Sequence, residues 1–240
     1  MTRRMATTTR LRRLADDRIR CAPDTVERHL IVADLLGAPA TVLDVGGLPG
    51  QLNGYLPSSE VLAANVSEPA DVIVPEDHLP FPDGAFTATT SLDVLEHVPP
   101  DSRPGFIAEM LRVTEHRSVL CCPLGSPEHD ALEAEIDAWY RELTGDGHPW
   151  LREHLEYGLP TLGGIRALYE QAGAEVRFLF HGDARVTGKQ FRTVVLARER
   201  HRLSDLARFA AFRLPYRPQT AVATTPTPWT NRVFAVVDRA

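Results

Sequence analysis

The chain has few cysteines and no long apolar run, and each shortage excludes a class of protein. Its three cysteines, Cys21, Cys121 and Cys122, lack the C-x-x-C spacing that is typical of metal sites. We therefore expect no metal, and we interpret the cysteines as small buried hydrophobes in a reducing compartment. Because no stretch reaches the roughly 18 apolar residues of a membrane span, we expect no transmembrane helix and no membrane partner.

The chain has no excess of positive charge, because its 32 acidic residues outnumber its 26 basic ones. The formal net charge is −6, and only Lys189 among the 26 basic residues is a lysine. A general nucleic-acid binder is normally basic, so we expect no nucleic-acid partner. Residues 1–23 are rich in arginine but lack the apolar core of a secretory signal. We expect them to form a basic helical arm rather than a targeting peptide, on a cytoplasmic protein.

The length and the patterning favour one α/β domain. With 240 residues and 43% hydrophobic residues, the chain can bury a core without a disulfide. Apolar runs alternate with helical patterns, which predicts βαβ units and a mainly parallel sheet. We expect strands at 41–45, 60–66, 71–74, 86–92, 117–122, 175–180 and 231–237. We expect helices at 24–36 with a cap near Asp24, from Asp101 or Ser102 onward, at 161–172 and at 189–214.

This pattern divides the chain into a basic arm and one domain, residues 24–240. The alternation of apolar runs and helical patterns is interrupted at residues 126–158, where a polar, helical stretch predicts an insertion that could serve as a lid. A helix and a Pro/Thr loop between residues 183 and 230 then precede the last strand.

The most informative segment is the loop Asp44-Val45-Gly46-Gly47-Leu48-Pro49-Gly50, which follows the first predicted strand. Parallel α/β sheets bind ligands at the carboxyl ends of their strands, and glycines there let the backbone approach a ligand closely. The glycine spacing is not G-x-G-x-x-G, which counts against a nicotinamide oxidoreductase, and no Gly-Lys-Ser/Thr follows. The loop therefore favours a nucleotide-like ligand without a pyrophosphate.

Two segments of the chain resemble one family. TVLDVGGLPG is similar to the glycine-rich first motif of class I S-adenosylmethionine-dependent methyltransferases, and LPFPDGAFTATTSLDVLEHVP resembles the following region of the methyltransferase type 11 group. The resemblance covers about residues 24–125. It implies a doubly wound, mainly parallel, seven-stranded sheet of the Rossmann-like methyltransferase fold, with S-adenosyl-L-methionine as cofactor.

The resemblance also implies where the cofactor binds. Asp44 would face the methionine end, Gly46, Gly47 and Gly50 would form the loop beneath it, and Asn65 would face the ribose. The remaining implied contacts are Glu76 or Asp77 near the adenine, and Ser91, Leu92 and Asp93 beside the sulfonium.

Three positions depart from the family pattern: Leu48 replaces the middle glycine, Asn65 an acid, and Thr87 an Asp. They keep open the alternative of a catalytically weak or inactive methyltransferase-fold binding or partner protein. A carboxylate accepts stronger hydrogen bonds than an amide, so Asn65→Asp should tighten cofactor binding. The sign would reverse if a backbone carbonyl faced the amide NH₂ group.

Histidine is the side chain best suited to accept a proton from a hydroxyl near neutral pH. His97 follows the fourth predicted strand and is the candidate base, although it could equally bond a neighbouring loop. His148 and His154 flank Trp150 in the insertion, where they could contact the acceptor or belong to an exposed helical hairpin. We expect a small-molecule acceptor, methylated on an oxygen of a sugar or secondary metabolite, by a protein that could form a homodimer.

Overall fold

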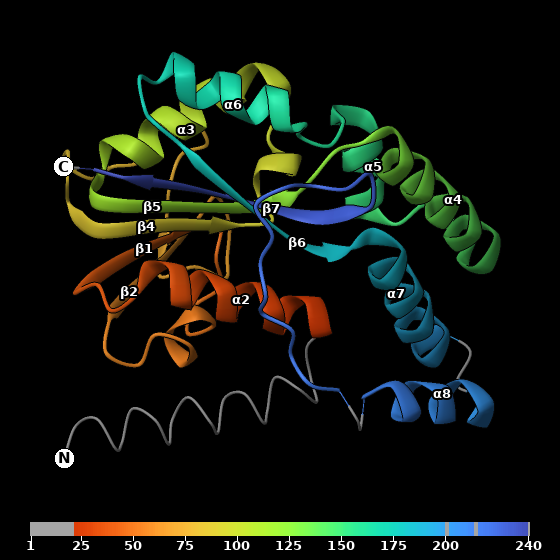
Figure 1. Cartoon of the computed structure of the whole chain (residues 1–240). Coiled ribbons are helices and arrows are strands. Elements are labelled where there is room, and N and C mark those ends of the chain that lie inside the picture. The colour runs from red at the N-terminus through yellow and green to blue at the C-terminus, as the bar shows by residue number, and fades with distance from the viewer. Residues whose placement is uncertain (1–21, 200–201, 214–215, 240) are drawn as a thin grey trace.

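A seven-stranded sheet with helices on both faces forms the centre of the computed structural model (Figure 1). The model describes residues 22–199, 202–213 and 216–239. Residues 1–21, which include most of the predicted basic arm and Cys21, lie outside the described residues. No helix among the described residues is both long and apolar enough to cross a membrane.

The sheet has the order β3-β2-β1-β4-β5-β7-β6. All neighbouring strands are parallel except β7, which is antiparallel to both β5 and β6. The strands are β1 (Thr41–Val45), β2 (Glu60–Asn65), β3 (Val72–Ile73), β4 (Phe86–Leu92), β5 (Thr114–Pro123), β6 (Arg177–Asp183) and β7 (Thr230–Asp238). The chain runs outward from β1 to β3 and returns at β4, so the crevice between β1 and β4 is the topological switch point where such sheets bind ligands. The predicted fold class is confirmed.

Alternating side chains of the strands divide the core into two clusters. On one face, α3 (Arg103–Arg112) and α6 (Leu162–Gln171) cover Leu43, Leu120 and Val233. On the other face, α2 (Pro23–Leu36) and the 3-10 helix η1 (Leu52–Gly54) cover a second set of strand side chains, Val42, Val119 and Phe234 among them. Both Cys121 and Cys122 are fully buried in β5, one toward each cluster, as predicted.

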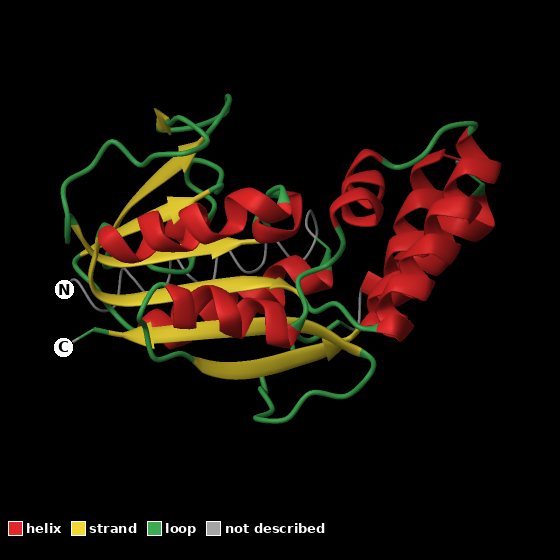
Figure 2. Ribbon diagram, turned by 90° about the horizontal axis from the view of Figure 1, so that it is seen from above, coloured by secondary structure: helices red, strands yellow, loops and turns green. Residues whose placement is uncertain are grey.

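Both helices of the insertion lie beyond the carboxyl ends of the parallel strands, where Figure 2 shows a group of helices at one end of the sheet. This group contains α4 (Pro127–Thr144) and α5 (Pro149–Tyr157), joined by α7 (Ala184–Glu199) and α8 (Leu203–Arg213). α7 packs closely on α4: a Cβ at Gly188 would lie 2.9 Å from the side chain of Ile136. The insertion therefore stands over the edge of the sheet where a ligand is expected.

Several predicted boundaries differ from the structure. The Arg-rich helix expected at 189–214 is two helices, and β6 begins two residues later than expected and extends to Asp183, because it pairs with β7 to that residue. The predicted cap role of Asp24 is wrong. Pro23 occupies the first turn of α2 and the capping position, Ala22, has no side-chain bond, because the Asp24 carboxylate instead faces β7. The helix expected from Asp101 or Ser102 onward begins at Arg103, and Ser102 precedes it without a side-chain cap bond.

Candidate functional site

The glycine loop after β1 is packed so closely that two of its glycines have no room for a side chain. Gly46 has φ of +80°, and a Cβ there would lie 2.3 Å from the Val94 side chain. A Cβ on Gly47 would lie 2.1 Å from Oδ2 of Asp44. Gly50 has φ of +75° but open space around it. Gly46 thus lets the loop approach Val94, which follows β4, and Gly47 lets it pass close to Asp44, while Gly50 leaves the outer part of the loop open.

Asp44 is a buried carboxylate at the end of β1. It is 2% exposed, and its Oδ1 has no hydrogen-bond partner in the described part of the chain. Burial raises the pKa of Asp44 to about 7, and the nearby positive charge of Arg28 offsets part of this rise. An unpaired buried carboxylate is costly unless a ligand satisfies it. Its geometry therefore fits a cationic or hydrogen-bond-donating group, such as the ammonium of an amino acid.

The two departures in and after this loop, Leu48 and Asn65, take different positions. The side chain of Leu48 is 45% exposed, so it does not fill the space under the loop. Asn65, at the end of β2, donates from Nδ2 to the carbonyl of Gly46 at 3.4 Å. Its Oδ1 accepts from the backbone N–H of Val66 at 2.8 Å. The amide therefore joins β2 to the glycine loop, and its oxygen has a second lone pair for a ligand hydroxyl.

The other residues expected at the cofactor lie on the loop after β3 and near the end of β4. Glu76 and Asp77 lie on an exposed loop after β3. Ser91 in β4 is fully buried, and its Oγ has no partner among the described residues, whereas Leu92 is half-buried. The departure at Thr87 lies at the other end of β4, where it bonds Thr41 at 3.2 Å, far along the strand from the ligand edge.

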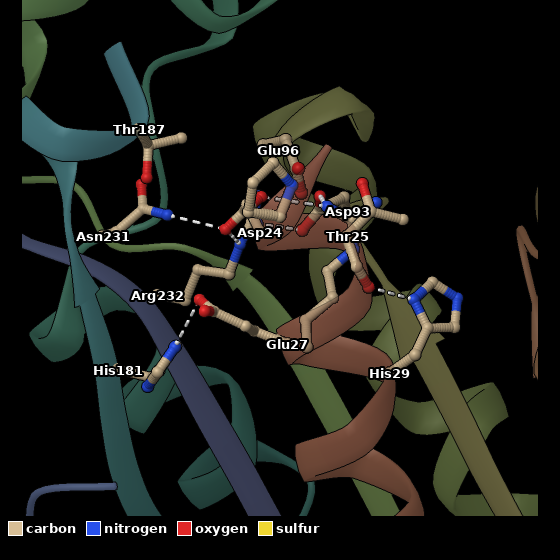
Figure 3. Close-up of polar contacts among 12 residues, drawn as sticks. Asp24, Thr25, Glu27, His29, Asp93, Glu96, His181, Thr187, Asn231 and Arg232 are labelled. Carbon is tan, nitrogen blue, oxygen red and sulfur yellow. Dashed lines mark hydrogen bonds and ion pairs between the residues drawn. The ribbon is translucent and has the colours of Figure 1, made fainter. Parts of the chain in front are cut away.

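Asp93 belongs to a buried ion-pair network that sequence analysis did not find (Figure 3). It has φ of +55°, and its carboxylate pairs with Arg28 at 2.8 Å and with Arg232 of β7. Arg232 also donates from Nε to Asp24 at 3.0 Å, and Asn231 donates to the same carboxylate at 3.1 Å. Burial alone would raise the pKa of Asp24, but the Arg232 guanidinium holds it well below its usual range. The network joins α2, β4 and β7 at the ligand edge.

His97 ends the 3-10 helix η2 (Leu95–His97), which follows β4. Its Nδ1 lies 2.6 Å from Glu153 Oε2, and its ring centroid lies 4.9 Å from that of His154, both on α5. Burial and the neighbouring His154 lower the pKa of His97. The structure thus brings the predicted base and one of the predicted lid histidines together. His148 packs on Tyr140 and Phe191 and makes no ring contact with His97.

Comparison with known proteins finds one family model that matches the central region of the chain. Residues 43–122, which include the glycine loop and η2, match the methyltransferase domain family. No curated protein matches the chain.

Solved structures show the same fold at low sequence identity. A SAM-dependent methyltransferase from Archaeoglobus fulgidus is 12% identical, with a TM-score of 0.54 over 94% of this chain and 98% of that one. Geranyl diphosphate C-methyltransferase from Streptomyces coelicolor is 14% identical, with a TM-score of 0.52 over 89% and 78% of the two chains. Phosphoethanolamine N-methyltransferase 2 from Haemonchus contortus, in complex with S-adenosyl-L-methionine, is 12% identical, with a TM-score of 0.52 over 88% and 52%.

Proposed function

We propose that this chain is a class I S-adenosylmethionine-dependent methyltransferase and that it transfers the methyl group to an oxygen of a small-molecule acceptor such as a sugar or secondary metabolite. The observation that supports this most is the buried, unsatisfied carboxylate of Asp44 beside a glycine loop at the switch point of the sheet. The names of the solved relatives include a carbon and a nitrogen acceptor, so the choice of oxygen rests on this chain's own residues.

The residues at the ligand edge fit the cofactor. Asp44 would face the cationic methionine end, with Gly46, Gly47 and Gly50 beneath it. Asn65 would accept from a ribose hydroxyl with its free lone pair, and Glu76 or Asp77 would approach the adenine. Ser91 and Leu92 would lie beside the sulfonium, and Asp93 would act there mainly by holding Arg28 and Arg232. When bound, the cofactor supplies an electrophilic methyl group.

The acceptor side is proposed to lie between η2 and the insertion. Methyl transfer is an in-line displacement, so the protein mainly has to align the acceptor and exclude water. The segment 126–158 would act as the lid of the domain 24–240, because α5 meets η2 at the His97–His154 contact. We propose that His97 accepts the proton of the acceptor hydroxyl, with Glu153 fixing the orientation of its ring.

Two measurements test this proposal. Calorimetric titration should show binding of S-adenosylmethionine and of its demethylated product but not of NAD. Incubation with methyl-labelled cofactor and a panel of sugars and phenols should then give label in an ether product, and His97→Gln should lower this rate by about 10²-fold or more with cofactor affinity unchanged. Binding of NAD alone would refute the proposal. Cofactor binding without transfer to any acceptor would favour the alternative of a catalytically weak binding protein.

A further inference from the structure

Three side chains with metal-binding atoms meet where η2 faces α5. Glu96 and His97 lie on η2, and His154 lies on α5, 57 positions further along the chain than His97. One donor atom from each lies within 4.8 Å of the other two. Two imidazoles and one carboxylate at this distance form a three-ligand set that leaves part of an ion's coordination sphere open.

Carboxylates orient both imidazoles. Glu153 lies 2.6 Å from Nδ1 of His97, and both oxygens of Glu133, on α4, lie 3.1 Å from Nδ1 of His154. A carboxylate that accepts from Nδ1–H leaves Nε2 unprotonated, with its lone pair free for a metal. Carboxylate–histidine–metal arrangements of this kind recur in protein metal sites.

Two of the three side chains in this cluster have a polar atom without a hydrogen-bond partner among the described residues. Glu96 is 1% exposed, and its Oε2 has no hydrogen-bond partner among the described residues. Nε2 of His154, whose side chain is 10% exposed, also has no hydrogen-bond partner in the described part of the chain. Buried polar atoms normally have partners, and each exception requires an explanation, for which an absent ion is one.

We propose that Glu96, His97 and His154 bind one divalent transition-metal ion of the zinc, cobalt or manganese type. Two nitrogen donors favour such ions over magnesium and calcium, which prefer oxygen ligands. Bonds of about 2.1 Å place donor atoms roughly 3.0–3.4 Å apart. The donor atoms already lie within 4.8 Å of one another, so an approach of at most roughly 1.8 Å between α5 and η2 would complete the site.

Such an ion would give the lid a chemical role. If the proposed oxygen methylation is correct, the acceptor hydroxyl would occupy an open coordination position, where a metal lowers the pKa of a bound hydroxyl. His97 would then hold the ion rather than accept the proton. The expectation that the chain binds no metal was based on cysteine spacing, which carries no information on histidines from separate elements.

The test uses the full chain, freed of metal by a chelator and titrated with Co²⁺ while visible absorption is recorded. We expect one equivalent to bind saturably, with a spectrum typical of nitrogen and oxygen ligands, and Zn²⁺ but not Mg²⁺ to displace it. His154→Gln and Glu96→Gln should abolish binding, and Glu133→Gln should weaken it 10- to 100-fold. His116→Gln is the matched control, because His116 is an exposed histidine of β5 outside the cluster, and this variant should bind like the wild type.

Circular dichroism establishes that each variant is folded, and His97→Gln replaces any variant that is not. Absence of saturable binding in the wild type, or its persistence in His154→Gln and His97→Gln, would overturn the proposal. Cofactor titration on the same samples separates the two hypotheses. Cofactor binding without Co²⁺ binding refutes only the metal site. Co²⁺ binding without cofactor binding refutes only the proposed function.

Discussion

Replacement of Asp44 by asparagine should stabilise the protein and impair cofactor binding at the same time. The carboxylate is buried, and its pKa is raised from 3.8 to about 7. Between these pH values the folded state binds more protons than the unfolded state, so stability falls as pH rises through this window and stays low above it. Asparagine has nearly the same shape but no charge to desolvate.

The magnitude follows from the shift. One pKa unit corresponds to about 1.36 kcal/mol, so a rise of about three units corresponds to a cost of roughly 4 kcal/mol at pH 8. Local relaxation reduces this figure, and we expect Asp44→Asn to raise the free energy of unfolding at pH 8 by about 2–4 kcal/mol. At pH 4 the wild-type carboxyl is largely protonated in the folded state, and the two proteins should differ little.

Urea unfolding of both proteins at pH 4 and pH 8 measures this difference. Asp101→Asn is the matched control, because Asp101 is exposed on the 3-10 helix η3 (Pro100–Ser102) and has no burial cost to relieve. A stability difference that is the same at both pH values would refute the explanation by charge burial.

Cofactor titration supplies the second half of the test. A cationic methionine end requires the ionised carboxylate, so wild-type affinity should fall by about tenfold per pH unit below pH 7. Asp44→Asn should bind at least tenfold more weakly at pH 8 and lose this pH dependence. A stabilised variant with wild-type affinity would show that Asp44 does not face the cofactor.

Three further variants test other parts of the site. Gly50→Val should fold, since open space surrounds the position, but lose cofactor binding by tenfold or more, because the branched side chain resists the positive φ of the loop; calorimetry on the folded variant decides this. Asn65→Asp should weaken cofactor binding up to about tenfold rather than tighten it. A carboxylate cannot donate to the Gly46 carbonyl, which lies 3.4 Å from the amide nitrogen. Tighter binding in calorimetry would contradict this geometry. Arg232→Met should lower the free energy of unfolding by about 3–5 kcal/mol, because it leaves Asp24 buried without its main partner; a loss below about 1 kcal/mol in urea unfolding would show that the network is not stabilising.

The sequence predicted the sheet because each strand is a local apolar run bounded by turn residues. The TVLDV and FTATTSL runs match β1 and β4 at both ends. The loop after β1 was predictable for the same reason, since its glycines are consecutive in the chain. Strand ends were less accurate where pairing with a distant strand, such as β7, decides how far a strand continues.

The ion pairs could not be predicted, because their partners are far apart in the sequence. Asp24 and Arg232 are separated by 208 positions, and Asp24 alone has the features of a helix cap. The contact of His97 with Glu153 likewise depends on how the insertion docks, which no local pattern encodes. The orientation of the Asn65 amide toward the loop carbonyl was foreseen only as a condition that would reverse the expected effect of Asn65→Asp.

The position of β7 between β5 and β6 has a consequence for synthesis on the ribosome. Apart from an isolated bridge between Phe180 and Ala223, β6 pairs with no other strand among the described residues, so it cannot join the sheet until residues 230–238 have been translated. During that interval its apolar side chains, Leu179 and Phe180 among them, have no sheet to join, and the nascent chain exposes a strand that is prone to aggregation. The same event delivers Arg232 to Asp24 and Asp93. The ligand edge is therefore completed only when β7 inserts, and a nascent chain that is released or cleaved before residue 230 should be recognised by chaperones rather than by the cofactor.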